Sequence, residues 1–250
     1  MNVRRILSPS LIMCVGLGVL LATYAPQISL LPYMKWELRN AAELWVVPAP
    51  LRVAANEPCK GRTFSYFGYE FETPWTQVKR ERKQESVAAL NFSGRQFVTI
   101  FDPAQSANEL DLMKQSAAKR GVELRAVLGD EAGRSRYALR SWMWNLTPAD
   151  LRLFSSRQKM ASSSVFLTLK KIWMTGIKGG LYSFETSRFR GFQKGGPGQD
   201  DVIIIEAFDA QDRKIEIWIG AERGSKNRPS QADINTILYS LRPVSTTQAK

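Results

Sequence analysis

Residues 64–103, FSYFGYEFETPWTQVKRERKQESVAALNFSGRQFVTIFDP, decide the fold. Apolar and polar residues alternate along this stretch, and such alternation predicts consecutive strands of an antiparallel sheet, because successive strand side chains point to opposite sides. Pro74 ends the first run of aromatic residues. The alternation assigns that run to two faces, with Phe64, Tyr66 and Gly68 on one and Phe67, Tyr69 and Phe71 on the other.

The remainder of this stretch predicts three further strands. Residues 78–82 are charged, which suits a sheet edge or a solvent-facing side. Residues 87–92 and 96–101 are apolar, and Ser93, Gly94 and Arg95 between them predict a hairpin turn.

A leader precedes the sheet. Residues 6–25, which begin at Ile6 and end at Ala25, contain no charged residue and follow two arginines. Twenty such residues just cross a hydrocarbon core of roughly 30 Å. They are either a cleaved signal peptide or a retained anchor, and retention is favoured because Pro26 would follow the cut. With the arginines in the cytoplasm, the chain would be a single-pass cell-membrane protein with an extracytoplasmic C-terminal domain.

Composition divides the rest of the chain into three parts. Residues 26–59 are predicted to hold an interfacial helix and a linker, because Trp36 and Trp45 stand among mixed charges and prolines follow at 48, 50 and 58. Residues 60–244 are predicted to form a single domain, in keeping with the usual size of domains. Residues 245–250 are predicted to be a disordered tail.

Helices are expected between the strands. Residues 104–120 have apolar side chains at helical spacing. Ser135 favours a capped helix over residues 134–145, although the alternation there also fits a strand. Thr147 and Asp150 resemble a capping box, which predicts a short helix to residue 154. An apolar stripe predicts a longer helix over residues 156–174.

The last third of the chain returns to strands. A second group begins at residues 181–192, residues 191–201 (GFQKGGPGQDD) predict a glycine-rich loop, and residues 202–208 and 214–219 predict a hairpin. Ser230 is expected to cap a last helix, which Pro243 ends. Strands in two groups, separated and closed by helices, predict an α+β domain in which an antiparallel sheet is layered with helices.

The passage GYEFETPW, an aromatic hairpin leading into Pro74 and Trp75, resembles the Mog1/PsbP-like fold, and the order of elements over residues 64–243 agrees with it. The resemblance implies an α/β/α sandwich and an accessory or binding role. The helical insertion between Asp130 and Met174 departs from a minimal version of that fold. The phrases SFETSRFRGFQ and FDAQDR resemble bacterial membrane-anchored proteins, and no function attaches to that likeness.

Composition excludes several kinds of chemistry. The chain has no histidine, so Ser-His and Cys-His nucleophile pairs, histidine metal sites and histidine pH switches are ruled out. Its two cysteines, Cys14 and Cys59, do not predict a disulfide across the fold. We find no metal-binding motif and no nucleotide-binding glycine loop, and we expect no cofactor.

The positive charge is concentrated in one region. The net charge is +12, and residues 125–194 alone carry 13 positive and 4 negative residues. Aromatic residues stand beside these cations, as in surfaces that contact lipid head groups. The candidate binding residues are therefore Arg136, Arg140, Trp142, Trp144, Lys170 and Lys171. Core packing with cations that reach to the surface is the alternative.

One spacing suggests an enzyme. Ser156 and Lys159 form an S-x-x-K pair, as do Ser116 and Lys119, and on a helix such a pair places an amine near a hydroxyl nucleophile. The S-D-N and K-T-G elements that accompany this pair in β-lactamases are missing from the sequence. A serine hydrolase is therefore kept only as an alternative.

Taken together, the sequence predicts a non-enzymatic binding or accessory protein at the membrane. It would be held there by residues 6–25, and its partner would be a protein or an anionic lipid. A third option is peripheral binding of anionic lipid or nucleic acid by residues 125–194. Nucleic acid is not the preferred partner, because the cations are interspersed with apolar residues and do not form the basic tracts of nucleic-acid binders.

Overall fold

A computed structural model of the chain describes residues 38–53, 61–106, 111, 114, 115, 118, 119, 129, 130, 133–151 and 157–244. The chain divides into two compact units, where the sequence predicts one domain over residues 60–244. The first unit comprises Met1–Val47 and Met113–Gly176, and the second comprises Pro48–Leu112 and Ile177–Lys250. The predicted α+β class is confirmed, with one mixed and one antiparallel sheet among the described residues.

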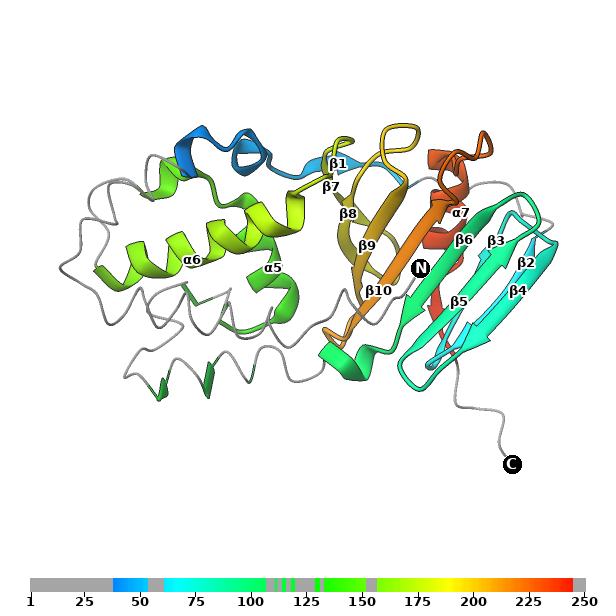
Figure 1. The fold of residues 1–250 in the computed structure, drawn as a ribbon. Helices are drawn as coiled ribbons and strands as arrows, with labels where there is room; N and C mark the ends of the chain where they lie inside the picture. Colours follow the sequence, from blue (N-terminus) through cyan, green and yellow to red (C-terminus); the bar gives the residue numbers. More distant parts are fainter. Residues whose placement is uncertain are drawn as a thin grey trace, which may run out of the picture. The chain divides into compact units, whose positions relative to one another are not determined.

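The described elements of the first unit are helical (Figure 1). They are η2 (Ala42–Trp45), α5 (Arg136–Asn145), η4 (Pro148–Leu151) and α6 (Arg157–Met174). The expected cap of α5 is present, because the Ser135 hydroxyl accepts a hydrogen bond from the Ala138 N–H at 2.9 Å. Half of the capping box predicted at Thr147 is present, since the Thr147 N–H donates to the Asp150 carboxylate, and the Thr147 hydroxyl donates to the same carboxylate, while the Asp150 N–H donates to the Thr147 carbonyl. A single 3-10 turn follows it.

The large sheet of the second unit has eight strands in the order β1-β7-β8-β9-β10-β6-β5-β4. All neighbours are antiparallel except β1 and β7. Its strands are β1 (Ala49–Leu51), β4 (Val78–Lys83), β5 (Val87–Phe92), β6 (Gln96–Phe101), β7 (Leu181–Glu185), β8 (Arg190–Lys194), β9 (Val202–Phe208) and β10 (Lys214–Ala221). The expected charged strand is β4, and it lies at the edge as predicted.

A small sheet has the order β11-β3-β2, with β2 (Arg62–Tyr66), β3 (Tyr69–Thr73) and β11 (Arg242–Pro243). Here the predicted assignment of faces is wrong. Phe67 and Gly68 both have positive φ, so the chain reverses in a two-residue turn and Tyr66 pairs with Tyr69. The alternation restarts after this turn, and the aromatic residues predicted for opposite faces are buried together.

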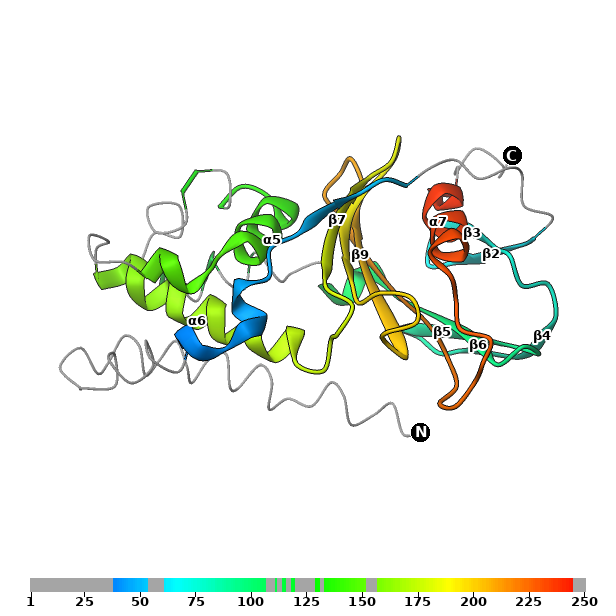
Figure 2. The same cartoon turned by 90° about the horizontal axis from the view of Figure 1, so that it is seen from above.

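The core of the second unit lies between the two sheets and α7 (Gln231–Ser240), as Figure 2 shows. Ser230 and Asp233 form a capping box at the start of α7. The helix packs against β3, and its Ser240 hydroxyl accepts a hydrogen bond from the Glu72 N–H at 2.8 Å. Isoleucines of β9 and β10 fill the core from the large sheet, with Ile205, Ile215 and Ile217 fully buried.

Two further predictions are corrected. The proline-rich linker contains strand β1. Pro50 has no N–H to donate to a neighbouring strand, and it is tolerated here because β1 is an edge strand of the large sheet. The glycine-rich loop starts later than expected, since β8 continues to Lys194. Most of the helix predicted over residues 104–120 lies outside the described residues, and its start is the 3-10 turn η3 (Pro103–Ser106).

Candidate functional site

One face of the large sheet is only half buried over three consecutive strands. In β5, in β6 and in residues 214–219 of β10, the side chains alternate strictly between buried and half buried. The buried set faces the core, so the half-buried set forms the opposite face. This face, which we call the outer face, consists of Val87, Ala89, Asn91, Phe97, Thr99, Phe101, Lys214, Glu216 and Trp218.

Cross-strand pairing places small residues in the middle of the outer face. Ala89 pairs with Thr99, and Thr99 pairs with Trp218. On β6, Thr99 is flanked by Phe97 and Phe101 at a distance of two residues, so both rings stand on its side of the sheet. The centroids of the Phe101 and Trp218 rings are 5.0 Å apart. The result is a flat aromatic area with small side chains at its centre.

The polar groups of this face form a series across β8, β9 and β10. The Trp218 indole Nε1 donates to Glu216 Oε1 at 2.8 Å, and Lys214 Nζ lies 3.7 Å from Glu216 Oε2. Glu216 pairs with Glu206 on β9, which forms a buried ion pair with Lys194 at 3.3 Å. Each carboxylate is thus matched by a lysine, an arrangement that offsets the cost of burying charge.

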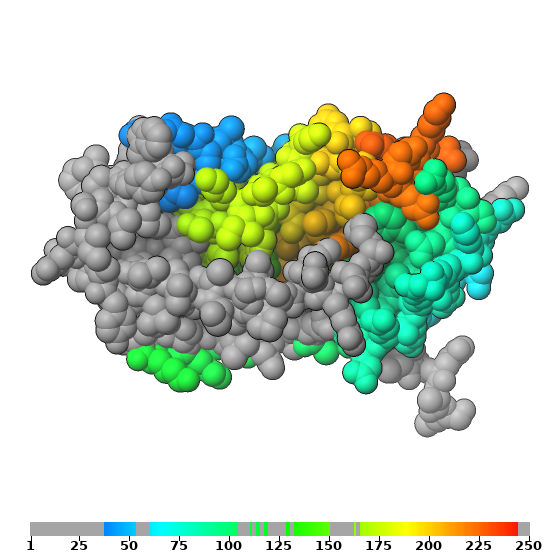
Figure 3. All heavy atoms as spheres, in the orientation of Figure 1, coloured from blue at the N-terminus to red at the C-terminus, as the bar shows by residue number. Residues whose placement is uncertain are grey.

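A basic edge lies next to the outer face. Strand β4 carries Lys79, Arg80, Arg82 and Lys83, all exposed, and one carboxylate, Glu81. In Figure 3 the teal atoms of this part of the chain lie at the surface on the right of the view. None of the four cations has an ion-pair partner among the residues that the structure describes.

The single carboxylate of β4 accepts a hydrogen bond from a tyrosine. The Tyr66 hydroxyl donates to Glu81 Oε1 at 2.6 Å. Burial raises the pKa of Tyr66 well above its ordinary value, and the hydrogen bond to the anionic Glu81 raises it further, so the phenol stays protonated and keeps donating. Glu81 pairs with the buried Leu90, so its side chain leaves the strand on the core side of the sheet, although it is exposed at this edge. With Glu81 ionised, the four cations still give β4 a net charge of +3.

The six residues predicted as a basic aromatic surface do not form one exposed surface. All lie on α5 and α6, but Trp144 and Lys170 are 0% exposed and Arg140 is buried. The other three, Arg136, Trp142 and Lys171, are half buried. Core packing, the alternative to a binding surface, therefore applies to Arg140, Trp144 and Lys170. A binding role for any of the six residues remains a prediction.

Contacts within this cluster explain its burial. The Arg140 guanidinium lies 4.3 Å from the centroid of the Trp173 ring, and the Trp144 and Trp173 rings are 5.9 Å apart. Trp142 meets Phe166 edge-on at 5.1 Å. Aromatic pairs and cation–π contacts of this kind hold α5 against α6.

Lys170 has the most unusual environment in the first unit. Its Nζ donates to three main-chain carbonyls, those of Leu44 at 3.3 Å, Trp144 at 2.8 Å and Leu146 at 2.7 Å. Burial lowers the pKa of Lys170 to about 8, against the opposing attraction of Asp150. An ammonium has three protons, and here all three are donated. Lys170 thus joins η2 and the C-terminal end of α5 to α6.

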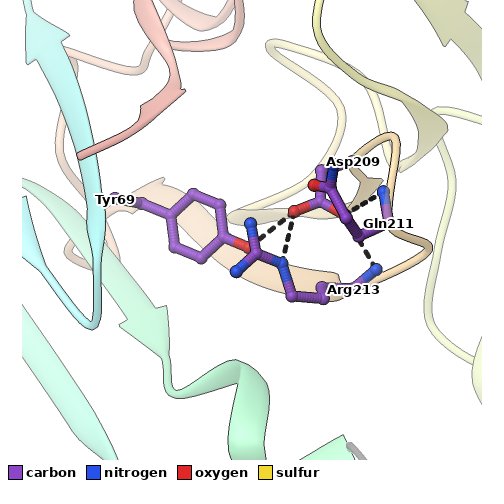
Figure 4. A network of polar contacts seen from close by, with 4 residues as sticks. All are labelled: Tyr69, Asp209, Gln211 and Arg213. Atoms are coloured by element: carbon purple, nitrogen blue, oxygen red, sulfur yellow. Dashed lines mark hydrogen bonds and ion pairs between the residues drawn. The ribbon is translucent and has the colours of Figure 1, made fainter. Parts of the chain in front are cut away.

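Two aspartates of the second unit hold loops through several hydrogen bonds from backbone N–H groups to one carboxylate. Asp209 accepts from the N–H groups of Gln211 and Arg213 with Oδ1, and from the Tyr69 hydroxyl and Arg213 Nε with Oδ2 (Figure 4). Asp200 accepts from three backbone N–H groups, those of Lys178, Gly179 and Gly196. Both aspartates thus act as turn carboxylates, because they accept hydrogen bonds from the backbone of the loops in which they lie or which they contact.

The remaining sequence candidates fall largely outside the described residues. Ser156 and Ser116 are not described, and neither is the side chain of Lys159, so the S-x-x-K pairs have no geometry to compare. No cluster of three potential metal ligands occurs among the described residues. The predicted anchor, residues 6–25, also lies outside them, and no helix within them has the length and hydropathy needed to cross a membrane.

The outer face was missed in the sequence because its strands were judged one at a time. In the sequence only residues 214–219 (KIEIWI) show a period of two, whereas residues 87–92 and 96–101 are largely apolar, so the outer face became visible only when the strands were placed side by side. We compared the chain with known proteins, and no family model, curated protein or solved structure matches it.

Proposed function

We propose that this protein binds a partner without catalysing a reaction, and that it does so at a membrane to which residues 6–25 hold it. The partner is an anionic protein, and the binding surface is the outer face together with strand β4. The finer features predicted from the sequence, an α/β/α sandwich of Mog1/PsbP-like type and an extracytoplasmic location, belong to the same proposal.

One observation carries the proposal. Strand β4 presents four cations at a sheet edge while its only carboxylate accepts the Tyr66 hydroxyl. Such a charged edge attracts anions over a distance of about 10 Å at ordinary ionic strength. The aromatic residues of β6 and β10, which are separated from β4 by β5, supply apolar area, which protein-binding surfaces need in addition to charge.

The test uses the full chain in nanodiscs of neutral phosphatidylcholine with three anionic probes, namely a glutamate-rich peptide, phosphatidylglycerol vesicles and a single-stranded oligonucleotide. The double variant R80Q/R82Q is compared with R188Q/K178Q, which removes the same charge from exposed positions elsewhere in the second unit. We expect R80Q/R82Q to weaken peptide binding about tenfold at low salt, since each rim charge contributes about 0.5–1 kcal/mol. The control variant should leave it unchanged.

The dependence of peptide affinity on salt concentration provides a second test of the proposal. Peptide affinity should fall as salt is added, and it should fall less steeply in R80Q/R82Q. Binding of vesicles or oligonucleotide in place of the peptide would change the partner class. If no probe binds, or if both double variants behave alike, the proposed function is wrong.

A further inference from the structure

The outer side of strand β4 exposes backbone hydrogen-bonding groups. The Gln84 N–H donates to the Val87 carbonyl at 2.8 Å, which makes this a hydrogen-bonded pair of the antiparallel ladder. Such pairs alternate along a ladder, so Arg82 and Arg80 also direct their backbone groups toward β5. Glu81 and Lys83 then direct their N–H and carbonyl groups away from the sheet.

No strand of the described chain covers this side, because β4 is the last strand in the order of the large sheet. An uncovered edge can accept a strand from another protein. The positive charge of β4 determines which kind of strand can pair with this edge. A second copy of β4 would place lysine and arginine against lysine and arginine, so pairing between copies is disfavoured, whereas an acidic strand is complementary.

The side chains of β4 specify the pattern of that strand. Arg80 and Arg82 pair with Asn91 and Ala89, so both lie on the outer face, two residues and about 7 Å apart. A strand bonded to the backbone of Glu81 and Lys83 would have non-hydrogen-bonded pairs at the two arginines, where opposed side chains are closest. Carboxylates at every second position would meet them.

On the basis of the proposed function, we propose that the partner binds through an extended acidic segment with carboxylates at alternate positions, which adds to the large sheet as a strand beside β4. Main-chain hydrogen bonds to Glu81 and Lys83 supply the pairing. Arg80 and Arg82 select the acidic side chains, which then lie on the same side of the sheet as the outer face.

The first test uses a blocked ten-residue peptide of alternating glutamate and threonine. Two N-methylated forms distinguish strand pairing from simple charge attraction, one methylated on the glutamates and the other on the threonines. Only one of the two sets of N–H groups can face β4, so one form should lose at least about tenfold in affinity and the other should bind as the parent does. A lysine-threonine peptide should not bind.

The second test changes the protein. Lys83→Pro removes a charge and an outward N–H, whereas Lys83→Gln removes the charge alone. Proline is tolerated at this position, because the N–H is not used in the pairing with β5. We expect Lys83→Pro to bind at least about fivefold more weakly than Lys83→Gln, with equal melting temperatures as the check that both variants fold.

The outcomes separate this inference from the proposed function. If the peptide binds in an Arg80-dependent manner but both methylated forms and both Lys83 variants bind alike, binding by charge stands and strand addition is overturned. If the peptide does not bind at all while vesicles or oligonucleotide do, the acidic segment is overturned. If no anionic probe binds, both proposals fail.

Discussion

At the scale of single residues, the buried Lys170 makes a contribution to stability that can be measured. Its ammonium donates to the main-chain carbonyls of Leu44, Trp144 and Leu146. Lys170→Met would remove three charge-assisted hydrogen bonds and leave these acceptors unsatisfied. We expect the variant to lower the free energy of unfolding by about 3 kcal/mol at pH 7. Urea unfolding followed by tryptophan fluorescence measures this loss.

The same residue predicts a pH dependence. Burial lowers the pKa of Lys170 from its ordinary value of 10.5 to about 8. Between these two values the unfolded chain holds a proton that the folded chain has released, so the contribution of this group to stability rises with pH. The contribution is complete above 10.5 and is lost as the pH falls through 8. The difference in stability between the native protein and Lys170→Met should therefore widen from pH 8 to pH 10, and a constant or shrinking difference would contradict the assignment.

Among the elements, the β2–β3 hairpin depends on the conformation of its turn. Gly68 has φ of +78° and no heavy atom within 4 Å of an added Cβ, so a substitution there tests the backbone alone. We expect Gly68→Ala to cost about 1 kcal/mol of stability, because a left-handed conformation is unfavourable for alanine. Gly68→Asn should cost less, since asparagine tolerates this region. Equal melting temperatures for the two variants would argue against a turn of this type.

In the whole molecule, the structure limits where the leader can be removed. Leu44 is fully buried in the first unit, and β1 pairs with β7 in the second, so a deletion to residue 59 would damage both units. Removal of residues 1–25 spares these contacts. We expect this shortened chain to leave the membrane fraction with an unchanged melting temperature and tryptophan fluorescence spectrum, since residues 1–25 contain no tryptophan.

The control for this deletion is an alkaline carbonate wash of the full chain, which strips peripheral proteins and leaves spanning ones in the pellet. If the shortened chain stays with the membrane, the anchor is not residues 6–25. If the full chain is released by the wash, it does not span the bilayer.

Local features of the fold were predictable from the sequence because neighbouring residues produce them. Apolar runs separated by turn residues located β5, β6, β9 and β10, and Ser135 and Ser230 marked the starts of α5 and α7. The faces of β2 and β3 were not predicted, because Phe67 at a left-handed turn position carries none of the usual turn signals.

The candidate site was less predictable than the elements. Arg140, Trp144 and Lys170 were predicted to lie at a surface because cations and tryptophans favour interfaces, but tertiary contacts bury all three. The charged edge β4 was correctly placed, whereas its relation to the outer face required knowing that β6 and β10 follow β5 in the sheet.

By itself, the sequence determined the α+β class, the type of most described elements and the exclusion of histidine chemistry, since these depend on composition, periodicity and caps within a few residues. Only the tertiary structure decided which strands are neighbours, that Ala49–Leu51 joins β7, and that the Lys170 ammonium is enclosed by carbonyls. The physical reason is that strand pairing and burial join segments distant in sequence, through hydrogen bonds and contacts that no local pattern encodes.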